Sequence, residues 1–406
     1  MRVSQSSAES EGFSVTADKP STMFKVIRVL VYVALTAMFL FLFYHEATGE
    51  FPADVTAHIK YALSENSSYS LIYPFLAFSY LNAGPLGVGV FLTIIEMATI
   101  VVCERFLRKL LPDVRIEVVF VLAVVVNFVT AIYLPVIHPH FTKGLSVGNS
   151  WHNSTYLGMK LVSLIAVWAY LRYVDYLESK NKFVDWCVFC VCVVASVSIK
   201  PSFAVIFGPT LVVLCVVDLV RDKKTLKRSL TLAVPFVIAL AILAYQYTAL
   251  YVEDTSSGIG FGLARVWRHN HFFFPLGMLQ SYAFPFLVFI FCWRKFKGDR
   301  NYRMALIMFF IALCIYLFVN ETGSRTYHGN FGWSLKFGVY YLFVTSIVIF
   351  CRAYAAKFPA FMKNPTQESD LRPSFWPELF MLLVLGLHLL SGFGNILKML
   401  LGHGYG

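Results

Sequence analysis

The sequence is poor in charged residues, and this excludes a soluble globular protein. Asp, Glu, Lys and Arg make up 14% of its 406 residues, whereas soluble domains carry about 25%. Hydrophobic residues make up 58%, and the mean hydropathy is +0.66. So few charges spread over many apolar runs predict a polytopic membrane protein.

Paired cysteines are missing from the predicted outer loops. All eight cysteines lie within or at the ends of apolar runs, so we expect no structural disulfide. Cys187 and Cys190 have the C-x-x-C spacing typical of redox or metal sites, but no second pair or flanking His completes such a site. We therefore interpret these cysteines as small apolar packing residues.

Long apolar runs, in contrast, are abundant, and they predict an all-α integral membrane protein with about 11 transmembrane helices of roughly 20 residues each. The fifth and sixth runs are separated only by Lys200 and Pro201, and form either two spans or one broken hairpin. Residues 69–83 are short and interrupted by Pro74, which favours an interfacial or re-entrant helix. The predicted spans are 24–44, 84–104, 117–137, 154–174, 183–199, 202–220, 229–250, 273–292, 304–320, 335–352 and 376–397.

The placement of Lys and Arg predicts the orientation in the membrane. Cationic clusters at 105–115, 221–228 and 293–303 fall on the same side as the N-terminus, and 25 of the 34 cations lie on that side. Short loops rich in Lys and Arg stay in the cytoplasm. We therefore expect a cytoplasmic N-terminus and an outer C-terminus. The net charge of +11 is then a topology signal, and we expect no nucleic-acid partner.

Polar segments divide the chain. Residues 1–22 are rich in Ser and predict a disordered cytoplasmic tail. A polytopic membrane domain follows over 23–356, with a first outer loop at 45–83. Residues 357–374 form a cytoplasmic linker, and 375–406 the last transmembrane helix and outer C-terminus. The first apolar run has no A-x-A-like cleavage site, which favours a retained anchor. Compact loops and the lack of soluble domains favour a bacterial inner membrane.

The outer loops hold most of the reactive side chains. Nine of the ten histidines belong to these segments. Polar side chains concentrated at one membrane face indicate an aqueous cavity there. The alternative is that they are ordinary solvated loop residues.

Asp54 and His58 are the leading catalytic candidates in the first outer loop. If residues 53–63 form a short surface helix, the two side chains share a face. In the structural interpretation, Asp54 follows Pro52 in the first turn, where the helix dipole favours an anion. In the functional interpretation, Asp54 is a general base supported by His58, or by His152 of the second outer loop.

Three stretches of the sequence resemble a known family. They are F-P-A-D-V-T-A-H-I (51–59), Y-P-F-L-A-F-S-Y-L-N-A-G-P-L-G (73–87) and E-R-F-L-R-K-L-L-P (104–112). Together they resemble the N-terminal third of GT-C glycosyltransferases, in particular the mannosyl- and aminoarabinosyl-transferase branches. The match covers residues 24–112, and over the rest of the chain it is architectural only.

The resemblance implies a multi-span enzyme with short surface helices between the first two spans. Such enzymes transfer a sugar from a polyprenyl-phosphate carrier to a glycan, lipid or protein acceptor, and an acid in the first outer loop is essential; here that acid is Asp54. Many members have a D-D, D-E or D-x-D pair at this position, and this sequence does not. A divalent metal is therefore possible but unsupported, and we expect no cofactor.

A phosphate leaving group needs cations fixed near the outer membrane face. Lys160 lies within the predicted fourth span and Lys200 at the outer joint of the fifth and sixth spans; Arg265 and Arg325 are further outer cations. Cations at membrane depth usually face a cavity or partner, although Lys160 could also snorkel to the interface. Arg suits phosphate better than Lys does, because its planar guanidinium group can donate two hydrogen bonds to one phosphate.

The remaining predicted substrate-binding residues come from two outer loops. Trp151 lies beside His152 and either stacks on a sugar ring or anchors the membrane interface, and the same loop contains Lys143. Residues 322–333 contain His328 and Asn330, and their glycines permit close approach. We interpret this stretch as a cavity wall.

Rival functions remain. Glu96, Asn127 and His388 are polar groups near the middle of the membrane, as a flippase or secondary transporter of a lipid-linked sugar would need. The outer face is much richer in polar groups, which favours chemistry on one side. A polysaccharide polymerase or ligase would share the lipid-linked substrate, and a non-catalytic scaffold is the remaining alternative.

Overall fold

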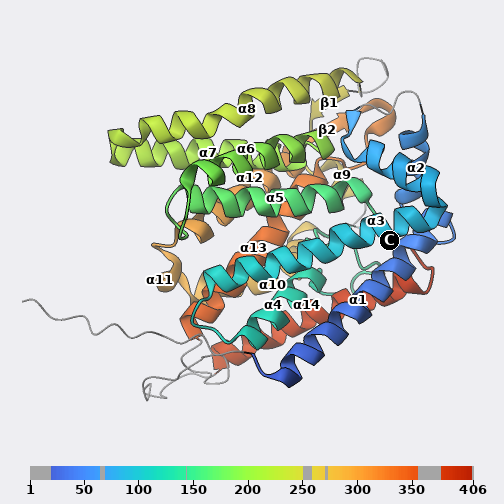
Figure 1. Ribbon diagram of the computed structural model, residues 1–406, viewed down its shortest axis with the longest axis horizontal. Helices are drawn as coiled ribbons and strands as arrows, with labels where there is room; N and C mark the ends of the chain where they lie inside the picture. The colour runs from blue at the N-terminus through green and yellow to red at the C-terminus, as the bar shows by residue number, and fades with distance from the viewer. Residues whose placement is uncertain are drawn as a thin grey trace, which may run out of the picture.

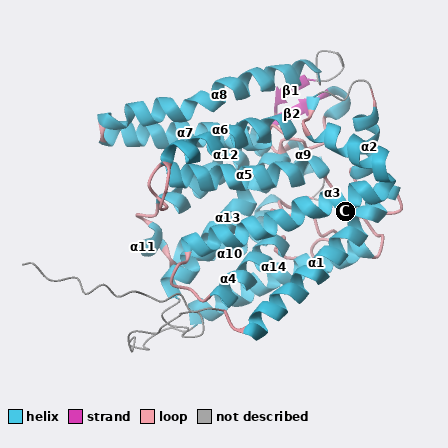
Figure 2. Cartoon of the chain, viewed as in Figure 1, coloured by secondary structure: helices cyan, strands magenta, loops and turns pink. Residues whose placement is uncertain are grey.

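The computed structural model describes residues 20–64, 69–142, 144–249, 258–269, 273–354 and 376–404. It is a helical bundle with one small sheet (Figures 1 and 2). Most of the predicted tail and all of the predicted linker lie outside the described residues. The elements are α1 Thr22–Thr48, α2 Val55–Leu63, α3 Ile72–Leu110, α4 Ile116–Phe128, α5 Ser154–Tyr173, α6 Lys182–Ile199, α7 Ser202–Arg221, η2 Lys223–Thr225, α8 Leu226–Tyr247, β1 Gly258–Phe261, α9 Arg265–His269, α10 Phe274–Phe291, α11 Trp293–Phe296, α12 Arg300–Phe318, β2 Val319–Thr322, η4 Gly323–Arg325, α13 Gly332–Tyr354 and α14 Trp376–Leu400.

The helices confirm a multi-pass, all-α membrane protein. Within the described residues, nine helical segments are long and apolar enough to cross a membrane, and α4 and α10 are apolar but shorter. A helix lies at each of the eleven predicted spans, including separate helices α6 and α7 on either side of Lys200 and Pro201.

The long helices run side by side, so the bundle has two ends. Figure 1 shows α2, β1, β2 and the C-terminus at one end, and α11 at the other. We call these the α2 end and the α11 end. Helix α13 is buried along almost its whole length, whereas α1 and α8 expose most of their surface. A helix that is apolar all round belongs at the centre of such a bundle, and α13 occupies that place.

Helix α4 is much shorter than the predicted span 117–137. It ends at Phe128, where Asn149 Nδ2 donates to the carbonyls of Val126 and Val129, both at 2.9 Å. These contacts satisfy helix-end carbonyls that would otherwise lack partners. The chain then leaves the helix through Val129, in an extended conformation, and continues without regular secondary structure. The contacts of Asn149 tie the end of α4 directly to the second predicted outer loop.

The irregular segment after α4 is hydrogen bonded to α10 and α14. Gln280 exchanges two hydrogen bonds with the backbone of Ile132, both at 2.9 Å. On α14, Ser391 Oγ accepts from the Tyr133 N–H (2.9 Å), and His388 Nδ1 lies 2.6 Å from the Thr130 carbonyl. Irregular backbone at membrane depth is tolerated where protein satisfies it, and these contacts do so.

The first predicted outer loop contains two helical pieces. Helix α2 confirms the short helix expected over residues 53–63. The predicted interfacial stretch 69–83 is continuous with the next span, because both belong to α3, which is broken at Ala83 and Gly84. Gly84 has φ +58°, a value that glycine adopts without strain. The kink separates the stretch that contacts α2 from the span itself.

Candidate functional site

Asp54 is held at the α2 end by the segment that precedes α5. It occupies the N-cap position of α2, yet its side chain makes no cap hydrogen bond. Instead, Asn153 Nδ2 donates to Asp54 Oδ2 over 2.7 Å. The Asp54 backbone N–H donates to the His152 carbonyl over 3.1 Å. The carboxyl group therefore faces a second loop, and its side chain remains 34% exposed.

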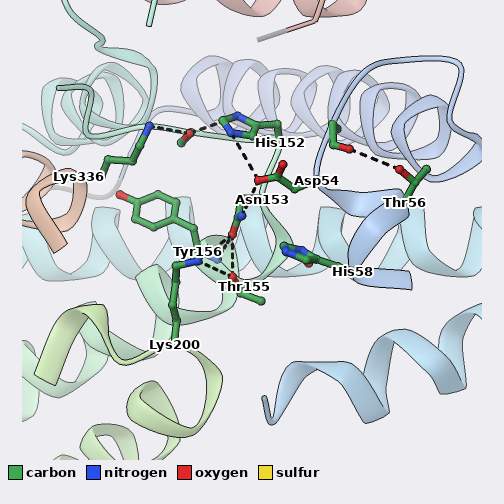
Figure 3. Close-up of polar contacts among 12 residues, drawn as sticks. Asp54, Thr56, His58, His152, Asn153, Thr155, Tyr156, Lys200 and Lys336 are labelled. Carbon is green, nitrogen blue, oxygen red and sulfur yellow. Dashed lines mark hydrogen bonds and ion pairs between the residues drawn. The ribbon is translucent and has the colours of Figure 1, made fainter. Parts of the chain in front are cut away.

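Asn153 orients Asp54 because its amide oxygen accepts hydrogen bonds while its NH₂ group donates one. Its Oδ1 accepts from the Tyr156 N–H (2.9 Å) and from Thr155 Oγ1 (2.7 Å), which caps the start of α5. Asn is among the preferred N-cap residues. With the oxygen used in this way, the NH₂ group faces Asp54 (Figure 3). The start of α5 thus sets the position of the acid.

Two neutral histidines flank the acid, in different ways. His152 Nε2 lies 3.9 Å from Asp54 Oδ2. His58 does not contact Asp54 through its side chain; its Nδ1 hydrogen bonds with Ser154 Oγ over 2.6 Å. Burial, and then nearby Lys200, lower the pKa of His58 to about 3. Burial and neighbouring basic groups also lower the pKa of His152 well below its ordinary value. Both rings are therefore uncharged near neutral pH.

Lys200 is brought to the same place by the joint between α6 and α7. Pro201 has no N–H to continue helix α6 and supports the start of α7. Lys200 Nζ donates to Thr155 Oγ1 over 2.9 Å and lies 4.5 Å from the centre of the Trp333 ring. Burial lowers the pKa of Lys200 from 10.5 to about 7, and the charge of Asp54 opposes this effect.

Lys336 and Trp333 complete the cluster. Trp333 ends the 322–333 stretch that the sequence analysis interpreted as a cavity wall, whereas Lys336 was not selected. They are three residues apart on the first turns of α13, so their side chains share a face. Lys336 Nζ donates to Ser150 Oγ over 3.2 Å and lies 4.8 Å from the centre of the Trp333 ring. The available signal was a lone cation just inside a predicted span, which is the criterion that selected Lys160.

Lys160 and Trp151 lie elsewhere than predicted. Lys160 Nζ pairs with Glu96 Oε1 at 2.9 Å, and neither side chain has any exposed surface. This pair joins α5 to α3 and leaves Lys160 shielded from any phosphate. Trp151 is also fully buried and packs on Phe128, with ring centres 5.9 Å apart. The aromatic ring beside the two lysines is that of Trp333.

The other predicted substrate-binding residues surround the two-stranded sheet. Asn330 Nδ2 donates to both carboxylate oxygens of Glu321, at 3.0 and 2.9 Å. Arg265 starts α9 directly after β1, and the Arg325 carbonyl accepts from the His328 N–H at 2.9 Å. Lys143 lies outside the described residues.

The α2 end therefore combines an acid, two lysines and an indole from three separate segments, and a fourth segment, before α5, holds the acid in place. Within the part of the chain that the structure describes, neither Lys200 nor Lys336 forms an ion pair with a carboxylate. Two nearby cations without such partners suit an anionic ligand. Asp54 is placed to accept a proton. Among the described residues, no three His, Cys, Asp or Glu side chains lie together as metal ligands would.

Comparison with models of known protein families finds no match to this chain, and comparison with curated protein sequences finds no significant match.

Proposed function

We propose that this chain is a membrane glycosyltransferase of GT-C type, which moves a sugar from a polyprenyl-phosphate donor to a glycan, lipid or protein acceptor. The observation that carries the proposal is the convergence of Asp54 with Lys200 and Lys336 around Trp333 at one end of the bundle. In the orientation predicted from the cations, this end lies at the non-cytoplasmic face of a bacterial inner membrane.

The proposed reaction inverts the sugar. The acceptor hydroxyl oxygen attacks the anomeric carbon, and its proton passes to Asp54. The bond from that carbon to the phosphate oxygen breaks, and the electron pair leaves with the polyprenyl phosphate. Lys200 and Lys336 stabilise the charge that develops on the departing phosphate. His152 lies beside Asp54 and is neutral, so it does not act as a further cation that would compete with Lys200 and Lys336.

The direct test replaces Asp54 by Asn, which keeps the shape of the side chain and removes the base. We expect transfer from lipid-linked sugar to fall by about a thousandfold, within the range of general-base contributions, with unchanged expression. Glu50→Gln is the matched control, because Glu50 is an exposed acid of the same loop that pairs with His45. Transfer at the wild-type rate in Asp54→Asn would remove Asp54 from the chemistry and the enzyme proposal with it.

A carrier of lipid-linked sugars is the second candidate, because α4 is a half-length helix that ends in extended backbone. Discontinuous helices near the middle of the membrane are typical of secondary transporters. The pairing of Glu96 with Lys160 weighs against Glu96 as an ion site. In a flipping assay, a carrier would lose transport in Glu96→Gln and keep it in Asp54→Asn, and the transferase would show the reverse pattern in a transfer assay.

A further inference from the structure

A cavity of about 310 Å³ lies between α5 and α6, which run side by side in Figure 1, near the α11 end. We call it the α5/α6 cavity. Its apolar lining includes Ile165 and Ala169 from α5 and Val188 from α6. Because α5 ends at Tyr173 and α6 begins at Lys182, these apolar residues lie farther from the α11 end than the polar lining does. The cavity is therefore polar at the helix ends and apolar toward the middle of the bundle.

The carboxylate in the lining is already compensated. Among the described residues that line the cavity, Asp185 is the one acid. Arg172 Nε lies 3.2 Å from Asp185 Oδ1, and the Asp185 side chain is only 4% exposed. Ser179 Oγ also donates to this carboxylate. An anion that enters the cavity therefore meets no unpaired negative charge in its lining.

Three hydrogen-bond donors of the lining lack acceptors. Lys180 is exposed, and within the described part of the chain its ammonium has no hydrogen-bond or ion-pair partner. Asn181 Oδ1 accepts from the N–H groups of Phe183 (3.0 Å) and Val184 (3.2 Å), which caps α6 and leaves the NH₂ group as a donor. The buried indole N–H of Trp168 has no acceptor among the described residues either. These donors suit a ligand rich in acceptor oxygens, such as a phosphate.

The cavity also borders the lipid-facing surface of the bundle. Val184, Val188 and Val191 are 51%, 36% and 68% exposed. Their spacing of four and three residues places them on one face of α6. Val184 and Val188 line the cavity as well. A ligand in the cavity can therefore extend an apolar chain along α6 into the hydrocarbon.

We propose that the α5/α6 cavity binds an anionic phospholipid. Its phosphate accepts hydrogen bonds from Lys180 and Asn181, and an acyl chain lies against Ile165 and Val188. In the orientation predicted from the cations, the α11 end is cytoplasmic, and basic pockets between helices on that side bind anionic head groups. A soluble phosphate would use the same donors but leave the apolar lining uncovered. The site lies at the opposite end from Asp54 and does not depend on the proposed function.

Photocrosslinking tests the site directly. Full-length protein is placed in phosphatidylcholine nanodiscs that contain a trace of phosphatidylglycerol with a photoreactive acyl chain, and mass spectrometry maps the crosslinked peptides. We expect crosslinks on the cavity-lining parts of α5 and α6. Lys180→Gln should lower their yield about fivefold, the contribution of one cation near an anionic lipid surface. Lys180→Arg should keep the wild-type yield, because it keeps the charge.

The matched control is Lys182→Gln, which removes a neighbouring cation that pairs with Asp175 and does not line the cavity. This variant should leave the yield unchanged, and thermal unfolding checks that each variant is folded. A wild-type yield in folded Lys180→Gln overturns the proposal. So does an equal fall in Lys182→Gln, because the effect would then come from the general charge of the surface. Photoreactive phosphatidylcholine that crosslinks as well as phosphatidylglycerol overturns it too.

Two further measurements distinguish a lipid in the cavity from other ligands and places. Val188→Phe fills the apolar part and keeps every charge, so it should lower the yield; a wild-type yield would place the lipid outside the cavity and overturn the proposal. Excess sn-glycerol 3-phosphate should leave the wild-type yield unchanged, because it lacks acyl chains. If it instead displaces the photoreactive lipid and raises the Tm of wild type but not of Lys180→Gln, the cavity binds a soluble phosphate and the phospholipid proposal falls.

Discussion

The two ends of the bundle differ in how their charged side chains are paired. At the α11 end, acids and cations from different helices pair directly; the pairs are Arg28–Glu104, Arg172–Asp185, Arg228–Asp218, Arg300–Asp218 and Arg352–Asp299. At the α2 end, Lys200 and Lys336 contact hydroxyl oxygens and one indole ring, and within the described residues neither pairs with a carboxylate.

The difference distinguishes charged groups that stabilise the fold from charged groups that can bind a ligand. Asp218 of α7 accepts from Arg228 of α8 and from Arg300 of α12, so one carboxylate joins three helices. Such charges already compensate each other. Two partly buried lysines close together repel each other and cost free energy until an anion compensates them. Unmatched charge therefore favours the α2 end as the candidate site.

Two cavities lie at the α11 end, and the one with the larger volume, about 400 Å³, borders Leu226, Leu230 and Val234 at the start of α8. A cavity of about 310 Å³ lies between α5 and α6 at the α11 end, lined in part by Trp168, Arg172 and Asp185. Arg172 Nε lies 3.2 Å from Asp185 Oδ1, and Ser179 also donates to this carboxylate. Because Arg172 and Asp185 are paired with each other, these two groups offer a charged ligand little.

After Asp54, the largest effect on activity is expected from the lysines of the α2 end. Lys200→Met and Lys336→Met should each lower kcat/KM for transfer by about ten- to a hundredfold, the value of a hydrogen bond to a charged group. Stability should stay the same or rise, because a costly buried charge is removed. Transfer kinetics and thermal unfolding measure both effects. Lys60→Met, on the exposed face of α2, is the control, and wild-type kinetics in both site variants would contradict the assignment.

The reverse pattern is expected at the α11 end. Asp218→Asn leaves Arg228 and Arg300 without their carboxylate, and should destabilise the protein by about 2 kcal/mol. Transfer by the folded protein should be unchanged, since the variant is far from Asp54. Thermal unfolding and kcat/KM on the same preparation test this. A large loss of activity with an unchanged Tm would show that the two ends are not independent.

The pH dependence should come from the α2 end. The folded pKa of Lys200 is about 7, below its ordinary 10.5, so the ammonium is charged below pH 7 and is lost as the pH rises through that value. KM for an anionic donor should therefore be lowest below about pH 7 and rise above it. His58, with a pKa of about 3, does not contribute there. Lys200→Arg should flatten the profile, and an equally steep rise of KM in that variant would assign the titration to another group.

The smallest effect is expected from the indole ring. Trp333→Phe keeps an aromatic face beside both lysines but weakens its attraction for cations, at a cost of about 1 kcal/mol or about fivefold in KM. Trp151→Phe, in the core beside Phe128, should lower stability instead. Donor titrations and melting curves separate the two. Equal effects of both substitutions on KM would contradict the placement of Trp333 at the site.

Sequence reasoning selected Asp54, His152 and Lys200, which the structure brings together, but it misjudged Lys160 and Trp151. Asp54 could be selected from the motif around it and from the short helix α2, because both are local features of the sequence. Lys160 and Glu96 were each recognised as costly charges at membrane depth, but their pairing at 2.9 Å joins residues 64 positions apart. Trp151 was chosen because it lies beside His152 in the sequence, but the structure buries its indole ring against Phe128.

The sequence by itself determined the class of protein and the places of its helices. The reason is that the length of an apolar run and the distribution of cations are local properties, and the bilayer responds to each of them directly. Only the tertiary structure decided which polar groups meet. The short α4, the cap at Asn153 and the joint at Lys200 bring four distant segments to one end, and contacts between such segments depend on how the helices pack rather than on the residues next to them in the chain.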